Sequence, residues 1–306
     1  MTSKDNSENG SPNRVQFFTL ANDAEDFAQA CLMIDSLREF GGQLAGCPVW
    51  VFSRQPDILA AREWVERDVI AQPLQVPEVM QGYYFGAMVA ACSQAEALAG
   101  VGVTSLVWVA PGCLFLGEPG LFDLGEQYDA AVRPVHIRNV GLPRGAAPDA
   151  FWRGVYTALG VENIPLGVES FVDSQALNAY FNSHAFSVRP ILGLMRRWQA
   201  YFADLVADSA YQHLACQDEA HKIFLFQAIL STLLATAIPA QRLRLLPPDY
   251  NYPYNLQAEI PAGRRATRME SLTCLAYEER SLDPDQIEDI SIQPELQGWL
   301  KAHLGA

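Results

Sequence analysis

Short apolar runs alternate with amphipathic segments over the first hundred residues. Residues 15–21 are aromatic and β-branched, which is typical of a buried strand. Asn22 and Asp23 follow as candidate helix caps, and apolar residues at helical spacing run from there to Gly41 and Gly42, which end the helix. The chain therefore opens with a predicted strand that leads directly into a helix.

The same alternation continues along the first half of the chain. It predicts strands at residues 48–53, 69–76 and 103–109, and helices at residues 58–65 and 83–98. Strands that alternate with helices favour an α/β fold with right-handed crossovers and a mostly parallel sheet. In such sheets, ligands bind beyond the carboxyl ends of the strands.

The second half is less regular. It predicts strands at 128–135 and 243–246, one or two strands at 179–189, and helices at 149–159, 190–206 and 219–237. No internal repeat and no Ser/Gly linker separates the halves. We therefore expect residues 15–306 to form one continuous domain after a loose polar tail of residues 1–14, with two fused subdomains as the alternative.

Residues 223–238 form the longest apolar run. The run has 16 residues, contains Gln227 and stops at Pro239. A membrane helix needs about 20 apolar residues. The pattern predicts a buried helix here rather than a membrane span.

Composition and charge narrow the classes of function. Half of the 306 residues are hydrophobic, and Lys plus Arg number 21 against 35 Asp plus Glu, for a net charge of −14. This charge opposes binding dominated by nucleic-acid phosphates, although it leaves room for a local basic patch. The six cysteines form no Cys-x-x-Cys pair and the first residues lack the apolar core of a signal peptide, so we expect reduced, buried thiols in a cytoplasmic protein.

Several short motifs carry no functional prediction. Residues 218–221 spell Asp-Glu-Ala-His, but the phosphate loop that a helicase also needs is missing from the sequence. Gly100 and Gly102 follow a helix and precede a strand, the reverse of the turn that presents N–H groups to a pyrophosphate. His213 and His221 share a helix face but lack a third strong ligand, which favours a packed or solvated pair over a metal site.

Five segments share their order and spacing with one known superfamily. They are residues 17–22 with 30–40, 106–119 (LVWVAPGCLFLGEP), 180–190 (YFNSHAFSVRP), 221–231 with Gln227, and 246–253 (LPPDYNYP). Together they resemble GT-A-type glycosyltransferases, which use nucleotide-diphospho-sugar donors. The resemblance implies a single-domain, Rossmann-like fold with a mostly parallel central sheet flanked by helices. It also implies a nucleotide-binding half of about residues 15–125 and an acceptor half of about residues 126–306.

One departure from the superfamily affects the chemistry. The two acidic residues of its Asp-x-Asp turn hold a divalent cation, but Ala110 and Gly112 stand at these positions and neither side chain can bind a metal. Residues 84–86 also lack the lysine often found there. We therefore expect no metal cofactor, and Mn²⁺ or Mg²⁺ could enter only through other carboxylates, with Asp218 or Glu219 the nearest suspects.

Cationic side chains can replace a metal beside a diphosphate. A basic segment follows residue 251, and a second group of arginines follows the strand at 128–135. The diphosphate-binding candidates are Arg264, Arg265, Arg268 and Arg133, with Arg138 and Arg144 nearby. The alternative is that all of them are solvated loop charges.

The resemblance also points to other site residues. On the nucleotide side these are Thr19, Ala21, Asn22, Trp108, Ala110 and Gly112, and the catalytic candidates are Asn182, His184 and Gln227. The polar triplet 182–184 interrupts an aromatic stretch and is costly to bury without partners, although an exposed hairpin tip would explain it equally well. His184 is expected to act as a general base or to donate to a sugar hydroxyl. Trp108 either stacks on a base or fills the core.

These observations predict a divergent, metal-independent glycosyltransferase with a nucleotide-sugar donor and an acceptor that the sequence does not identify. The alternative is a catalytically inactive GT-A-like protein that acts as a binding or assembly partner. Because the strands before two crossovers end on the same side of a sheet, the turn 110–112 should lie beside residues 19–22. The sequence leaves the oligomeric state open.

Overall fold

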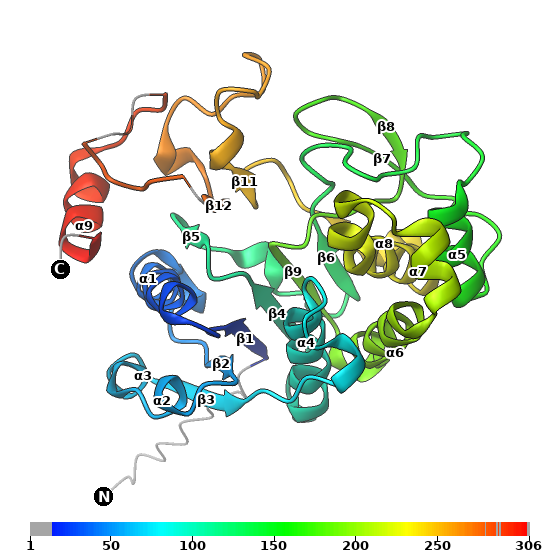
Figure 1. Cartoon of the computed structure of the whole chain (residues 1–306). Helices are drawn as coiled ribbons and strands as arrows, with labels where there is room; N and C mark the ends of the chain where they lie inside the picture. Colours follow the sequence, from blue (N-terminus) through cyan, green and yellow to red (C-terminus); the bar gives the residue numbers. More distant parts are fainter. Residues whose placement is uncertain (1–13, 279, 286, 288, 305–306) are drawn as a thin grey trace, which may run out of the picture.

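The computed structural model describes residues 14–278, 280–285, 287 and 289–304. Its centre is a seven-stranded sheet with the order β10-β6-β9-β4-β1-β2-β3 (Figure 1). The strands are β1 (Val15–Leu20), β2 (Val49–Ser53), β3 (Val69–Pro73), β4 (Ser105–Val109), β6 (Ala130–Val132), β9 (Ala185–Val188) and β10 (Leu243–Leu245). Of these strands, β9 alone runs antiparallel to its neighbours. This confirms the predicted α/β fold with a mostly parallel sheet.

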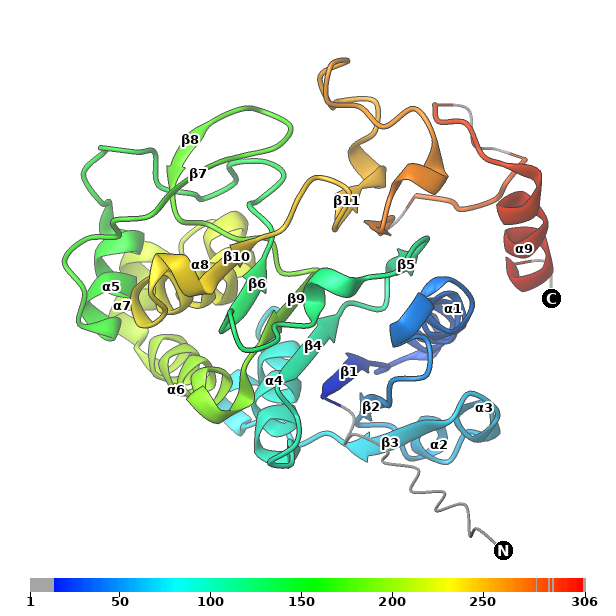
Figure 2. The same cartoon turned by 180° about the vertical axis from the view of Figure 1, so that it is seen from behind.

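Successive residues of the central strands serve two opposite cores, because side chains alternate across a sheet. Phe17 and Val107 pack on one face with α1 (Ala24–Phe40), whereas Phe18 and Trp108 pack on the other face. The second face is covered by α4 (Gly86–Leu98), α6 (Leu194–Ala207) and α8 (Glu219–Ala237) (Figures 1 and 2). Both faces are therefore buried, as the near-continuous apolar strand sequences require.

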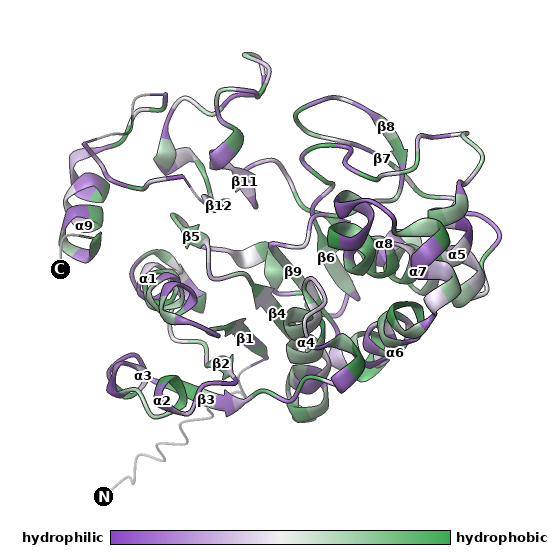
Figure 3. Cartoon of the chain, in the orientation of Figure 1, coloured by the Kyte–Doolittle hydropathy of each residue, from purple (hydrophilic) through white to green (hydrophobic). Residues whose placement is uncertain are grey.

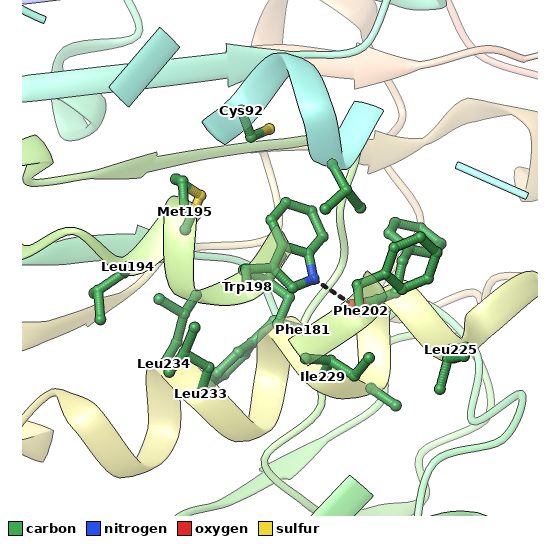
Figure 4. Close-up of a cluster of buried hydrophobic side chains, with 14 of the residues drawn as sticks. Cys92, Phe181, Leu194, Met195, Trp198, Phe202, Leu225, Ile229, Leu233 and Leu234 are labelled. Atoms are coloured by element: carbon green, nitrogen blue, oxygen red, sulfur yellow. Dashed lines mark hydrogen bonds between the residues drawn. The ribbon is translucent and has the colours of Figure 1, made fainter. Parts of the chain in front are cut away.

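Trp198 of α6 lies at the centre of the larger core and joins α6 to α8. Its indole N–H donates to the backbone oxygen of Phe226 at 2.8 Å, and its ring is fully buried among aliphatic and aromatic side chains (Figure 4). An indole needs such a partner when it is buried. This contact fixes the part of α8 that carries Phe226 and Gln227.

A smaller sheet brings the C-terminal part of the chain to the end of β4. It has the order β11-β12-β5, formed by β11 (Tyr252–Pro253), β12 (Cys274–Ala276) and β5 (Cys113–Phe115). Beyond it, α9 (Pro294–Leu304) buries Leu296 and Leu300 and leaves polar residues outside (Figure 3). Residues that follow β12 therefore lie close to the turn at residues 110–112.

Four short elements complete the second half. α5 (Ala150–Leu159) packs against α8, α7 (Ser209–Ala215) packs against α5 and α6, and β7 (Gly167–Glu169) pairs with β8 (Ala176–Asn178). α8 is the one helix in the described ranges that is long and apolar enough to cross a membrane by length and composition, and 61% of that stretch is buried inside the fold. The predicted buried helix at 219–237 is confirmed.

The structure corrects several predicted boundaries. The helix predicted at 58–65 is two short helices, α2 (Pro56–Leu59) and α3 (Arg62–Glu66), because the chain extends at Ala61 between them. The strand predicted at 128–135 is only β6, since Pro134 has no N–H to continue the ladder. Of the one or two strands predicted at 179–189, one is present, β9, and Phe181 before it forms an isolated bridge to Pro134. The predicted helix at 83–98 begins three residues later, at Gly86, because Phe85 adopts a left-handed backbone conformation with φ of 58°.

Candidate functional site

A cavity of about 450 Å³ opens at the carboxyl ends of β1 and β4. In the register of the sheet, Phe18 of β1 lies beside Trp108 of β4, so the two strands end together. Asn22 from the end of β1 and Ala110 from the end of β4 both line the cavity. The predicted placement of the 110–112 turn beside residues 19–22 is confirmed.

The third edge of the cavity comes from the residues just before β9. Because β9 is antiparallel to β4, its first residues lie where β4 ends, and Ala185 pairs with Val109. Ser183 and His184 therefore reach the cavity. The backbone oxygen of His184 accepts from the N–H of Ala110 at 2.7 Å, which ties this segment to the turn.

The polar triplet 182–184 is held by hydrogen bonds rather than exposed at a hairpin tip. Asn182 is buried, and its N–H donates to the backbone oxygen of Arg133 at 2.7 Å. The indole N–H of Trp108 donates to the Ser183 backbone oxygen at 2.9 Å. Ser183 Oγ donates to Gln227 Oε1 of α8 at 3.1 Å. These contacts supply the partners that a buried polar segment needs.

The ring of His184 is fixed on both sides. Asn182 Oδ1 accepts the His184 backbone N–H at 2.9 Å and lies 3.0 Å from ring Nδ1, so Nδ1 must carry a proton to donate to the same oxygen. The other ring nitrogen, Nε2, lies 2.5 Å from Oε1 of Glu278. A carboxylate accepts and does not donate, so both ring nitrogens face acceptor oxygens, an arrangement that a ring protonated on both nitrogens satisfies. This contact with His184 holds the pKa of Glu278 below its usual value.

Two further basic residues are buried next to the segment 182–184. The His136 ring stacks parallel to the His184 ring, with centroids 5.8 Å apart, and burial holds the pKa of His136 well below its usual value. Arg133 is buried with its guanidinium 4.8 Å from the centre of the Phe171 ring, and burial lowers its pKa to about 10. His136 is thus uncharged at neutral pH and adds no positive charge beside His184.

Aromatic side chains form the opposite wall. The ring of Phe85, just before α4, stacks on Phe226 of α8 with centroids 4.2 Å apart. The Tyr84 hydroxyl donates to the carboxylate of Glu219, which joins the same two elements. Trp108 lines the cavity although only 2% of it is exposed, so it fills the core and contributes an edge to the wall.

Three of the six predicted nucleotide-side residues line the cavity, and three do not. Asn22, Trp108 and Ala110 line the cavity. Thr19 and Ala21 are fully buried in the sheet and lie outside its lining. The Gly112 backbone oxygen accepts from the N–H of Tyr277, and a Cβ at residue 112 would meet Glu278 backbone atoms at 3.7 Å.

The predicted arginines have other partners. Arg264 pairs with Glu169 at 2.5 Å and also donates to the Phe171 backbone oxygen, and Arg265 donates to the backbone oxygens of Ala258 and Ile260. The Arg268 backbone bridges to that of Ser291. Among the described residues that line the cavity there is no Lys or Arg.

Other cavity residues escaped prediction. Asp26 follows β1 and accepts the N–H of Asn22 at 3.1 Å, and burial raises its pKa. Its position six residues beyond the end of β1, near the start of the predicted helix, was a signal that sequence reasoning could have used. Tyr83 and Phe85 were predicted only as the start of a helix. Nothing in the local sequence around Glu278 indicates its contact with His184.

The residues at the turn do not fit a metal ion. Ala110 and Gly112 offer no ligating side chain, and the described ranges contain no group of three or more His, Cys, Asp or Glu side chains placed to hold one. Asp218 Oδ2 lies 2.7 Å from the ring of His221, and Glu219 accepts from Tyr84. The two suspected carboxylates are thus engaged with other side chains.

Comparison with known proteins assigns the fold. No protein-family model matches the chain, and no curated protein sequence matches it. Two structures of the galactosyltransferase LgtC are similar to this chain. An active-site mutant of LgtC matches at 11% identity over 94% of this chain and 95% of that chain, with a TM-score of 0.52. A complex of LgtC with donor and acceptor sugar analogues matches at 12% identity over 90% of each chain, with a TM-score of 0.50. Mouse xyloside xylosyltransferase 1 in its apo form matches at 12% identity over 86% of this chain and 97% of that chain, with a TM-score of 0.49.

The likeness to LgtC defines the fold class. The chain has the GT-A-type fold of glycosyltransferases, as its sequence motifs predicted. Identity this low shows the fold alone. What the cavity does is therefore argued from its own residues.

Proposed function

We propose that this protein is a glycosyltransferase that uses a nucleotide-diphospho-sugar donor without a metal ion at residues 110 and 112. The observation that carries the proposal is the cavity at the ends of β1, β4 and β9 in a GT-A-type fold. Its hydrogen-bonding side chains face aromatic rings, and this combination suits sugars, which present hydroxyl groups and apolar faces. The sugar analogues bound to LgtC support a donor and an acceptor in a site of this fold.

The side chains suggest a division of roles. Asn22 and Asp26 at the end of β1 suit the nucleoside, because a carboxylate can accept from ribose hydroxyls. Asn182, His184 and Gln227 suit the transferred sugar and the diphosphate. With both ring nitrogens donating, His184 fits the role of hydrogen-bond donor better than that of general base.

Transfer makes one bond and breaks one. The bond from the anomeric carbon to the diphosphate oxygen breaks, a bond to an acceptor oxygen forms, the acceptor proton passes to a base or to solvent, and a nucleoside diphosphate leaves. Its negative charge needs a positive partner. Arg133, Arg264, Arg265 and Arg268 stay candidates for this role, although Arg264 would have to leave Glu169 first.

One observation favours a second candidate function. The cavity lining includes the carboxylates of Asp26 and Glu278, and no Lys or Arg among the described residues. A diphosphate meets little positive charge there. A catalytically silent GT-A-like protein that binds an uncharged ligand or a protein partner accounts for the same lining.

A donor panel separates the two candidates. We would measure release of nucleoside diphosphate from UDP-, GDP- and CDP-sugars in Mn²⁺ and in EDTA. The proposal predicts turnover of at least one donor, equal in both buffers. It also predicts that Gln227→Ala lowers kcat/KM at least about tenfold, which corresponds to 1.4 kcal/mol, whereas Gln241→Ala on an exposed turn stays within about twofold. No turnover of any donor by the parent would favour the silent protein, and turnover only in Mn²⁺ would refute metal independence.

The cysteines bear on where the protein works. All six are free and buried. Unpaired thiols suit a reducing compartment, and we propose the cytoplasm on this ground. Labelling of the cell fractions with an antibody to the protein tests this location.

A further inference from the structure

The charge of the cavity is concentrated at one contact. Among the described residues that line it, His184 is the one side chain that can carry positive charge, and both of its ring nitrogens face acceptor oxygens. Its ring Nδ1 is committed to Asn182, which is buried. Ring Nε2 points to the carboxylate of Glu278, which is the one partner of His184 that is substantially exposed.

Glu278 reaches this position from the far end of the sequence. Its side chain is 45% exposed, its other oxygen accepts from Asn255, and its backbone adopts a left-handed conformation with φ of 46°. The preceding residue, Tyr277, is tied to the Gly112 backbone oxygen at 3.0 Å. The carboxylate thus lies over the turn that has lost both acidic side chains.

We propose that Nε2–H of His184 is a binding site for a phosphate oxygen of a nucleoside diphosphate, and that the Glu278 carboxylate occupies this site in the free protein. The inference rests on the proposed function for its choice of ligand. Carboxylate and phosphate oxygens are both anionic acceptors, so the exchange keeps a charge-assisted hydrogen bond on Nε2. Glu278 can turn to solvent, because it is held by surface contacts.

The surroundings of His184 suit this exchange. His136, stacked behind the ring, is uncharged because it is buried, so it neither competes for the anion nor repels the His184 charge. Nδ1 stays bonded to Asn182 when the partner of Nε2 changes. The side chains missing at residues 110 and 112 leave the approach to Nε2 free of other carboxylates from the turn. Asp26, the other carboxylate in the lining, lies at the end of β1 and accepts a backbone N–H.

The test uses Glu278→Gln, which removes the competing charge at nearly constant size. Binding of UDP and of inorganic pyrophosphate is measured by calorimetry in EDTA. We expect Glu278→Gln to bind both anions at least about fivefold more tightly than the parent, and His184→Asn to bind them at least about tenfold more weakly, a difference of 1.4 kcal/mol. In the double variant the gain from Glu278→Gln should shrink to about twofold or less, because the site that Glu278 vacates no longer exists.

Matched variants separate this exchange from general charge effects. Glu63→Gln removes the same charge from an exposed position outside the cavity lining, and His213→Asn changes an exposed histidine. Both should bind the two anions within about twofold of the parent.

The outcomes distinguish the exchange from the proposed function. Tighter binding by Glu278→Gln is a gain, so it cannot come from misfolding, and melting curves check the His184→Asn variant. If Glu278→Gln and His184→Asn bind UDP as the parent does while nucleotide sugars are turned over, the exchange is wrong and the glycosyltransferase proposal stands. If the anions bind through His184 but no donor is consumed, the glycosyltransferase proposal fails and the exchange stands. If neither the parent nor Glu278→Gln binds either anion, both are overturned.

Discussion

Gly86 stands where the fold and the cavity meet, and Gly86→Ala should damage both. It is the first residue of α4 and lines the cavity. A Cβ built there would lie 2.3 Å from the backbone oxygen of Met80, in the short helix η2 (Glu78–Met80). Non-bonded heavy atoms normally meet at about 3.5 Å, so the start of α4 or η2 must move by roughly 1 Å.

The size of the effect follows from that displacement. Overpacking a tight site destabilises a protein by about 1–3 kcal/mol, and the preference of helices for Ala over Gly offsets part of this loss. We therefore expect Gly86→Ala to lower the free energy of unfolding by about 1–2 kcal/mol. Urea unfolding with an unchanged m-value measures the loss. Because the wall that carries Phe85 shifts with the helix start, binding of the proposed donor should weaken as well.

Gly100→Ala is the matched control. A Cβ at Gly100 has no heavy atom within 4 Å, and the residue lies in an exposed loop after the same helix. Its free energy of unfolding should stay within about 0.5 kcal/mol of the parent. If Gly86→Ala and Gly100→Ala unfold at the same urea concentration, the close approach of α4 to Met80 is not a constraint on the fold and the reasoning fails.

Three further changes test the framework around the site. Glu96→Gln should lower the free energy of unfolding, measured in urea, by about 1–3 kcal/mol, because the fully buried Glu96 carboxylate accepts two backbone N–H groups at the start of α6 and an amide cannot accept both equally well. The control Glu63→Gln, at an exposed position, should have little effect. Asp129→Asn should destabilise the protein at pH 7, because hydrogen bonds from two arginines, Arg242 above all, hold the pKa of Asp129 below its ordinary value. The difference in the free energy of unfolding between variant and parent should narrow as pH falls below about 4, since this stability is lost as the folded-state carboxylate is protonated, and a difference that stays constant down to pH 3 would contradict this. Gly298→Ala in α9 should raise the melting temperature, because its Cβ would enter open space within a helix, and a fall would contradict the helix assignment.

Local sequence pattern was sufficient for the elements that are buried on both sides or capped by their own residues. β1, β2 and α8 agree with the predicted ranges to within one residue at each end. α5 agrees with the helix predicted at 149–159 to within one residue, and Asp149 caps it with a side chain that accepts the N–H of Trp152. These elements need no distant partner to be recognised.

The missed elements depend on distant pairing. β5 and β12 have three residues each and exist because they pair across about 160 positions of sequence, from Leu114 to Leu275. A run of three apolar residues carries no periodicity that distinguishes a strand from a loop. The sequence pattern therefore could not predict the small C-terminal sheet or the position of Glu278 that depends on it.

The contrast between His184 and the arginines extends this point to charge. Arg264, Arg265 and Arg268 attracted prediction because they are concentrated in sequence, yet Arg264 and Arg265 donate to a carboxylate and to backbone oxygens outside the cavity lining. His184 is a single residue, and the acceptors that face its two ring nitrogens are an asparagine two residues before it and a glutamate 94 residues after it. Asn182 is local and was predicted from the cost of burying a polar triplet, whereas Glu278 is not local. Sequence pattern can therefore indicate the partner of ring Nδ1, Asn182, but not the partner of ring Nε2, Glu278. In the exchange proposed above, it is Glu278 that decides whether an anion can bind at Nε2.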